Sequence, residues 1–382
     1  MIGALLPLLR LPAVARLAFA ASVAWASAVH AQPATQEGAA PAAPARPAVV
    51  LLLPAPTTAF AQPAQALRAG FEAAHKFSGD DVALQVVELA DGSEALAAAL
   101  QAASDSGAGV IVGPLPRAAV TDVVDGQRST LPLVALNFPE SDAAAPGTML
   151  AMALSLESEA QRICRFALQE IVGTRGASVR PRVAVVARAT GLERRIAQAY
   201  VQALRAQGEV PQLIEWTPGA PNATAGLAAQ LAQPGLEAVF LALTARDAAQ
   251  IRALIPRQAQ VFGTSLLYVG DPRVSPEAAT LAHDLEGVRF VDMPWLLQPD
   301  HSGVMVYPAP ATMMPAEMLR LYALGIDAYR VASVWMKGER RFEIDGVTGR
   351  LSIDRAQSLR VERTPLMGVY RGGSVQRIDF GR

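Results

Sequence analysis

Residues 48–77, AVVLLLPAPTTAFAQPAQALRAGFEAAHKF, decide the fold of this chain. Residues 48–54 form a short, uninterrupted apolar run, which predicts a strand buried on both faces of a parallel sheet. A loop that carries Thr57 and Thr58 separates this run from residues 61–77, which we interpret as a helix. The stretch is therefore a strand-loop-helix unit, the repeating element of an α/β protein.

The same alternation of short strands and helices continues along the chain in two sets. In the first set, strands are expected at residues 82–89, 109–112 and 133–136, and helices at 93–103 and 117–125. In the second set, which follows a helix at 157–171, strands are expected at 182–187, 212–216, 238–243 and 261–264, and helices at 192–206, 224–232 and 245–255. Because crossovers between parallel strands are right-handed, each set predicts a doubly wound, Rossmann-like lobe with helices on both faces of its sheet.

A second informative stretch is GVRFVDMPWLL, residues 287–297. Val288 and Phe290 alternate with Arg289 as in a strand, and Pro294 then lacks a backbone donor, so we expect the strand to end there. Trp295 follows at once in a chain with only four tryptophans, and we expect it to pack at a crossover between the lobes.

The C-terminal part of the chain changes character. A long helix is expected at 315–337, followed by strands at 342–344, 349–353, 361–370 and 375–380 that do not alternate with helices. We assign residues 48–153 and about 298–338 to lobe one, and residues 154–297 and about 339–380 to lobe two. Such an order implies several hinge crossings and a cleft between the lobes, which is the architecture of a clamshell.

The N-terminal segment has the features of an export signal. Residues 1–31 carry only two charges, Arg10 and Arg16, ahead of an apolar run, and end in small residues around Val29 and Ala31. Residues 32–47 are an Ala/Pro-rich tether with no capacity to form a core. No later run approaches the roughly 20 apolar residues of a spanning helix, so we expect a soluble periplasmic protein. No cysteine follows the signal, so no lipid anchor is expected.

Composition argues against several functions. Without Arg10 and Arg16, 31 of the 33 basic residues remain against 34 acidic ones, and this balance gives no electrostatic basis for binding nucleic acid. Cys164, the only cysteine, is expected in a helix core. The four histidines show no metal-ligand spacing, and residues 263–267 lack the second glycine of a nucleophile elbow. We therefore expect no catalytic residue, metal or cofactor.

Ligands of doubly wound lobes bind at the carboxyl ends of the strands, so residues there are the candidates for a cleft. They are Thr57, Thr58, Gly113, Leu115, Asn137, Phe138, Thr190, Thr264, Ser265, Asp292 and Trp295. For each of them, an ordinary structural role in a turn, cap or core is the alternative. An amino-acid ligand would need an acid for its amine, and Asp271 or Asp292 would supply it. The prolines around Leu115 remove donors where a carboxylate site would want Ser or Thr.

Several motifs together resemble a known family. VIVGPLPR (110–117), PLVALNFPE (132–140), LEGVRFVDMPWLL (285–297) and GVTGRLSID (346–354) are similar to the LppC/LpoA-type penicillin-binding protein activators. GVRFVDMPWLL together with LYALGIDAYR (321–330) is the most specific part of the resemblance. The resemblance covers roughly residues 48–380. It implies the type I periplasmic-binding-protein fold and a periplasmic partner of a class A penicillin-binding protein in peptidoglycan synthesis.

The chain departs from the larger members of that family in two ways. They carry a cysteine directly after the signal, where this chain has Gln32, and an N-terminal helical-repeat domain, where it has the tether. Two functions stay open: a non-catalytic module that acts on a synthase by protein contact, and a receptor that closes on a small molecule in its cleft and delivers it to a transporter or sensor.

Overall fold

The computed structural model describes residues 48–175 and 182–378. The expected signal (1–31) and tether (32–47) lie outside the described residues, as do the last two residues of the strand expected at 375–380. Within these two ranges, no helix combines the length and the apolar character that crossing a membrane requires.

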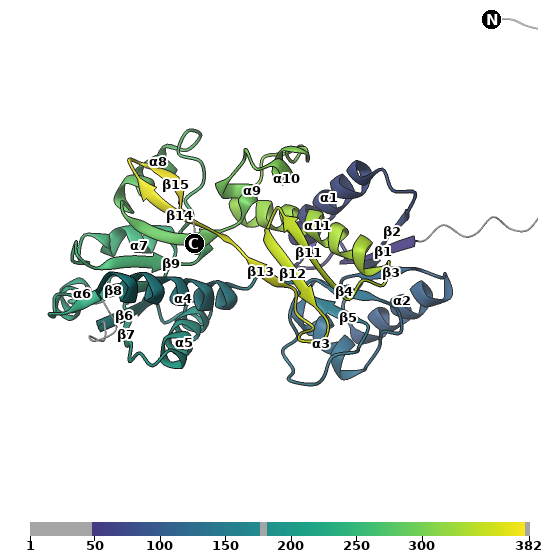
Figure 1. Ribbon diagram of the computed structural model, residues 1–382, viewed down its shortest axis with the longest axis horizontal. Coiled ribbons are helices and arrows are strands. Elements are labelled where there is room, and N and C mark those ends of the chain that lie inside the picture. The colour runs from purple at the N-terminus through teal and green to yellow at the C-terminus, as the bar shows by residue number, and fades with distance from the viewer. Residues whose placement is uncertain (1–47, 176–181, 379–382) are drawn as a thin grey trace, which may run out of the picture. The chain divides into compact units, whose positions relative to one another are not determined.

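Five parallel strands form the first sheet (Figure 1). In spatial order they are β2 (Ala83–Leu89), β1 (Ala48–Pro54), β3 (Val110–Val112), β4 (Leu133–Ala135) and β5 (Met149–Ala151). Val49 and Leu51 belong to the core shared with α1 (Ala61–Ser78) and α11 (Ala316–Trp335). Val50 and Leu52 belong to the opposite core, under α2 (Ser93–Asp105) and α3 (Arg117–Asp125). Strand β1 is thus buried on both faces, as its apolar run predicts.

Seven strands form the second sheet. In spatial order they are β15 (Ser374–Ile378), β14 (Leu366–Arg371), β10 (Val288–Asp292), β9 (Gln260–Gly263), β8 (Leu236–Ala242), β6 (Arg182–Ala187) and β7 (Gln212–Glu215). The run from β10 to β7 is parallel, whereas β14 and β15 add to it antiparallel. Helices α4 (Leu156–Arg175) and α5 (Gly191–Ala206) cover one face, and α6 (Ala223–Leu231), α7 (Ala245–Arg252) and α8 (Pro276–Asp284) cover the other.

The strand in residues 287–297 ends just before Pro294, as the sequence predicts. Strand β10 stops at Asp292, and Pro294 is the first residue of the short helix α9 (Pro294–Leu297), where a missing N–H costs nothing. Trp295 is half-buried, donates its backbone N–H to the Val347 carbonyl at 3.0 Å, and packs its ring 5.3 Å from that of Tyr322 on α11. Here the chain leaves the second sheet and, through α10 (Ser302–Met305), returns to the first.

The C-terminal tail divides in a way that the sequence assignment did not anticipate. Strands β14 and β15 join the second sheet, but β11 (Arg341–Gly346), β12 (Gly349–Asp354) and β13 (Glu362–Thr364) form a separate antiparallel sheet. Ile344, Leu351 and Ile353 on this small sheet belong to the core of the first lobe, not the second. The expected single strand 361–370 is broken at Pro365, which has no N–H for a ladder.

A buried acid holds the small sheet to α11. The side chain of Asp327 accepts the backbone N–H groups of Val347 at 3.0 Å and Thr348 at 2.7 Å, and the Thr348 hydroxyl at 2.7 Å. Burial raises the pKa of Asp327, and its bonds with Thr348 oppose that rise. These bonds fix the β11–β12 turn on a helix of the first lobe, which explains why the sheet sits there.

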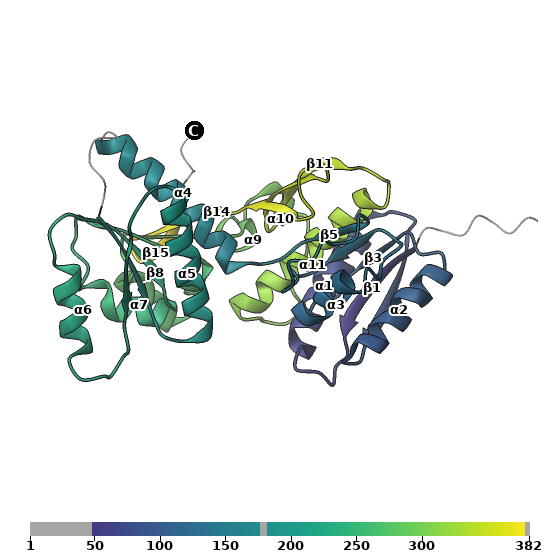
Figure 2. The same cartoon turned by 90° about the horizontal axis from the view of Figure 1, so that it is seen from below.

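Helices α1 and α11 lie side by side in both views (Figures 1 and 2). Two glycines allow their backbones to approach closely, because a Cβ on Gly325 would meet the Leu67 carbonyl and a Cβ on Gly70 would meet the Tyr322 carbonyl. The motif LYALGIDAYR therefore contains a glycine for which a larger residue has no room.

Candidate functional site

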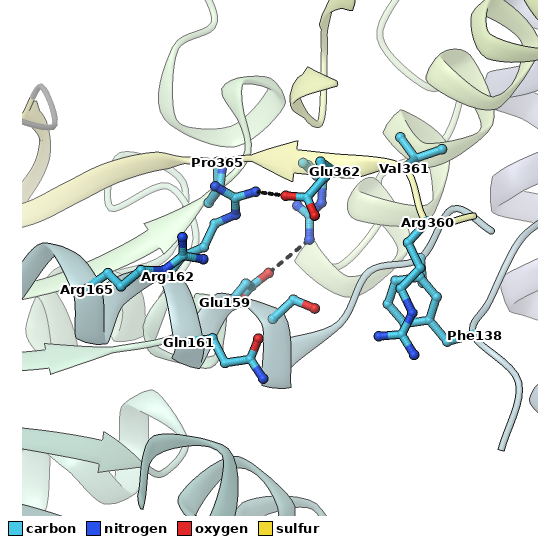
Figure 3. A pocket seen from close by; sticks show the side chains of 12 residues that line it. Phe138, Glu159, Gln161, Arg162, Arg165, Arg360, Val361, Glu362 and Pro365 are labelled. Carbon is cyan, nitrogen blue, oxygen red and sulfur yellow. Dashed lines mark hydrogen bonds and ion pairs between the residues drawn. The ribbon is translucent and has the colours of Figure 1, made fainter. Parts of the chain in front are cut away.

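A pocket of about 140 Å³ lies where α4, β13 and the loop after β4 meet (Figure 3). Four of its side chains are arginines and two are glutamates. The lining consists of Phe138, Ala153, Ser158, Glu159, Gln161, Arg162, Arg165, Arg360, Val361, Glu362, Arg363 and Pro365. The site thus combines a residue of the first lobe with the first turns of α4 from the second lobe.

Glu159 is the buried acid of the pocket. Its side chain is 6% exposed and accepts the backbone N–H of Ser265 at 2.9 Å, and Arg363 donates to its other oxygen at 3.4 Å. Burial raises the pKa of Glu159, Arg363 opposes that rise, and the negative charge of Asp292 adds to it. The carboxylate is therefore engaged on both oxygens by groups of the chain itself.

A second buried pair lies beside Glu159. Arg320 on α11 donates to both carboxylate oxygens of Asp292, at 3.0 and 2.6 Å, and to the Ser265 carbonyl at 2.9 Å. Burial alone would lower the pKa of Arg320, but the adjacent Asp292 raises it above its ordinary value. The fork-shaped contact satisfies both partners. Burial, reinforced by Asp292, also raises the pKa of Tyr268 nearby to about 12.

The remaining arginines of the pocket differ in how far they are neutralised. Arg162 donates to Glu362 at 3.0 Å. Burial lowers the pKa of Arg162 and Glu362 raises it, whereas the positive charges of Arg165 and Arg363 lower it further. Arg360 places its guanidinium 4.4 Å from the centre of the Phe138 ring. Among residues 48–175 and 182–378, neither Arg165 nor Arg360 has a carboxylate within ion-pair distance.

The structure brings some of the candidates from the sequence together. In the first lobe, Asn137 donates its side-chain amide to the Leu115 carbonyl at 3.2 Å and accepts the Phe138 N–H at 3.0 Å. Gly113 has φ +114, and a Cβ there would meet the Leu52 carbonyl, so its role is a tight backbone turn. Of this group, only Phe138 lines the pocket.

In the second lobe, Thr264, Ser265 and Asp292 are buried next to one another around Arg320. Ser265 begins the 3₁₀ turn η1 (Ser265–Leu267), donates its backbone N–H to Glu159 and accepts from Arg320 at its carbonyl. The Thr264 hydroxyl is buried with no hydrogen-bond partner among the described residues. Ser265 and Asp292 therefore hold Glu159 and Arg320 in place.

The other candidates lie away from the pocket or are otherwise engaged. Thr58 donates its hydroxyl to the Ala55 carbonyl at 2.9 Å in its own turn, and neither it nor Thr57 lines the pocket. Thr190 is exposed before α5 and makes no side-chain cap. Asp271 is paired with Arg273 at 2.7 Å, and Trp295 packs at the crossover.

Sequence reasoning missed the residues that dominate the site: Glu159, Arg162, Arg320, Arg360 and Arg363. Glu159 has a signal in sequence only as an acid in the first turn of a helix, where the helix dipole favours it. The arginines come from three distant segments of the chain, so their convergence is not visible in any local pattern. In the described ranges, no group of three or more His, Cys, Asp or Glu is arranged to hold a metal ion.

Comparisons with known proteins agree with this architecture. The model of the family described as "LppC putative lipoprotein" matches residues 44–217 and 220–367. A solved structure described as a "putative branched-chain amino acid ABC transporter" from Chromobacterium violaceum is 30% identical, with a TM-score of 0.71 over 85% of this chain and 100% of that one. No functionally curated protein matches the chain.

Two further solved structures are of LpoA from Haemophilus influenzae. The full-length protein is 19% identical with a TM-score of 0.69, and the match covers 87% of this chain but only 59% of that one. Its C-domain, described as a regulator of PBP1A, is 18% identical with a TM-score of 0.67 and is covered completely. These likenesses confirm the predicted fold of two α/β lobes of the type I periplasmic-binding-protein kind. Because the family model spans most of the described residues, the chain belongs to the LppC family.

Proposed function

We propose that this protein is a non-catalytic periplasmic partner of a class A peptidoglycan synthase, which it stimulates by direct contact. The family membership and the complete coverage of the LpoA C-domain, itself described as a regulator of PBP1A, support this proposal. The apolar N-terminal segment at 1–31 supports export to the periplasm through a cleavable signal.

One observation favours contact over solute binding: the carboxylates at the pocket and beside it are already neutralised by arginines of the same chain. Asp292 is held by Arg320 and Glu362 by Arg162, while Glu159 is held by Arg363 and a backbone N–H. A receptor for a free amino acid has to keep a carboxylate for the ammonium group, because an unpaired buried charge is costly. The three acids named here do not meet that requirement.

A partner of this kind acts by differential affinity. If the protein binds the active conformation of the synthase more tightly than the inactive one, its binding shifts the synthase towards activity. No group of the activator has to enter the reaction. The packed crossings between the two lobes, with Arg320 on α11 bound to Asp292 on β10, suit a rigid docking body.

The test is a purified assay with the class A synthase of the same organism. Protein purified from the periplasm is expected to co-purify with the synthase and to raise its rate of glycan polymerisation or of peptide cross-linking. A heat-denatured sample is the control for non-specific effects. The proposal is wrong if the folded protein neither binds the synthase nor changes either rate.

A second candidate is a solute receptor, favoured by the 30% identity to the Chromobacterium violaceum protein. A thermal-shift screen with leucine, isoleucine and valine at millimolar concentration distinguishes the two. A ligand at 100 times its dissociation constant adds about 2.7 kcal/mol to the stability of a protein that binds it. A clear shift with one of these amino acids would favour the receptor.

A further inference from the structure

We propose that the arginine-rich pocket binds a small dicarboxylate, with one carboxylate at Arg165 and the other at Arg360. Binding at this pocket is independent of the synthase contact, since either can occur without the other. The charges of the pocket do not balance, because its four arginines face two glutamates and leave a net charge of +2.

The pairing inside the pocket shows where this excess charge lies. Arg363 is engaged by Glu159 and Arg162 by Glu362. Arg165 and Arg360 are exposed and have no carboxylate at ion-pair distance in the described part of the chain. A guanidinium is a planar fork of donors that fits a carboxylate with two parallel hydrogen bonds. The guanidinium groups of Arg165 and Arg360 are therefore the groups that an anionic ligand would engage.

The positions of these two arginines select the shape of the ligand. Figure 3 places Arg162 and Arg165, on α4, at one end of the pocket, and Arg360 with Phe138 at the other. A ligand with its charges at opposite ends fits this arrangement, whereas a compact dianion such as phosphate engages one end only.

The size and the walls of the pocket fit a short carbon chain between the two charges. Its volume of about 140 Å³ is roughly ten times the 10–15 Å³ that one water needs. Ala153, Val361 and Pro365 supply apolar wall, and Gln161 adds an amide. No carboxylate of the lining is left to hold an ammonium group, since Glu159 and Glu362 are both paired. The lining thus favours a dicarboxylate over a zwitterionic amino acid.

Titration calorimetry at low ionic strength tests the proposal on protein purified from the periplasm, with succinate, glutarate, pimelate, inorganic phosphate and leucine as probes. Saturable binding is expected for at least one dicarboxylate, more tightly than for phosphate or leucine. Added salt should weaken it, because the arginines are exposed. The double variant R165A/R360A should bind at least about tenfold more weakly, since each exposed charge-assisted pair contributes modestly.

Three variants separate a binding role from a structural one. R205A removes an exposed arginine of α5 outside the pocket and should leave binding unchanged. R165K/R360K keeps the positive charges but loses the planar guanidinium groups that bind a carboxylate with two hydrogen bonds. Its affinity for a dicarboxylate should therefore fall between those of wild type and the double alanine variant. E362Q releases Arg162 and should tighten binding, by about threefold or more.

Some results would overturn the proposal. One is that no dicarboxylate binds saturably with a dissociation constant below about 10 mM; a millimolar complex corresponds to roughly −4 kcal/mol. Another is that phosphate or leucine binds more tightly than every dicarboxylate. The third is that R165A/R360A binds dicarboxylates with unchanged affinity. Stimulation of the synthase is measured in a separate assay, so failure here leaves the proposed function standing, and failure there leaves the pocket standing.

Discussion

Removing Arg320 should expose the cost of a buried, unpaired carboxylate. The Asp292 side chain is 1% exposed and the Arg320 side chain 11%, and two hydrogen bonds of 3.0 and 2.6 Å join them. In R320M the methionine keeps the apolar stem but leaves Asp292 without its counterion. Breaking a buried pair in this way costs about 3–5 kcal/mol, so we expect a loss of unfolding free energy in that range.

The partner variant should cost less. In D292N the asparagine retains an acceptor, and Arg320 still donates to the Ser265 carbonyl at 2.9 Å and lies near Glu159. We expect a loss of about 2 kcal/mol. The double variant R320M/D292N no longer buries an isolated charge, so its loss should fall short of the sum of the single losses by at least about 1 kcal/mol.

Urea denaturation followed by circular dichroism measures these differences, and equal m values across the variants license the comparison. R246M is the matched control, since Arg246 pairs with Glu277 on the surface, with side chains 69% and 57% exposed. Its loss should stay within about 0.5 kcal/mol. A loss below about 1 kcal/mol in R320M, or strict additivity in the double variant, would refute the reasoning. Asp292 would then be hydrated and free to hold an ammonium group, which would favour the receptor.

Three further variants test other parts of the structure. W295A should lose about 2–3 kcal/mol of unfolding free energy in the same urea titration, because the Trp295 ring is half-buried against Tyr322. This loss is smaller than that of a fully buried aromatic side chain. A loss under about 0.5 kcal/mol would contradict the packing. Burial raises the pKa of Glu159 above 4.5, so the folded protein holds the proton more tightly than the unfolded chain. The unfolding free energy of wild type should therefore fall relative to that of E159Q as pH rises from 4.5. A difference in unfolding free energy that does not change with pH would contradict the raised pKa. G325A should cost about 1–3 kcal/mol, because its Cβ meets a carbonyl of α1, whereas the control G226A on α6 has open space and should be neutral or stabilising.

The fold was predictable from the sequence because its signals are local. Continuous apolar runs such as residues 48–54 identify buried parallel strands, and the helices between them leave few topologies to consider. Pro294 marked the end of β10 for the same reason, since a proline acts on its own backbone. The small sheet β11–β13 was misassigned because its place depends on Asp327, which is distant in sequence and contacts Thr348 only in the folded chain.

The site was less predictable, because strand ends indicate where a cleft lies and not which side chains fill it. Thr57, Thr58 and Thr190 occupy such ends, yet none of them lines the pocket. The arginines that do line it come from α4 and from residues 360–363, about two hundred residues apart in the chain. Charge pairing of this range has no periodicity, so it becomes visible only in three dimensions.

The paired groups also form one connected series across the crossings between the lobes. Asp292 on β10 binds Arg320 on α11, Arg320 binds the carbonyl of Ser265, the N–H of Ser265 binds Glu159 on α4, and Glu159 binds Arg363 on β13. The first three links are buried and the last is partly buried. Low dielectric strengthens a buried link and makes its loss costly. The series ties together segments that a solute receptor would need to move, and it ends at the wall of the pocket. A dicarboxylate held by Arg165 and Arg360 engages neither Arg363 nor Glu159, so its binding is expected to leave this series and the docking body unchanged.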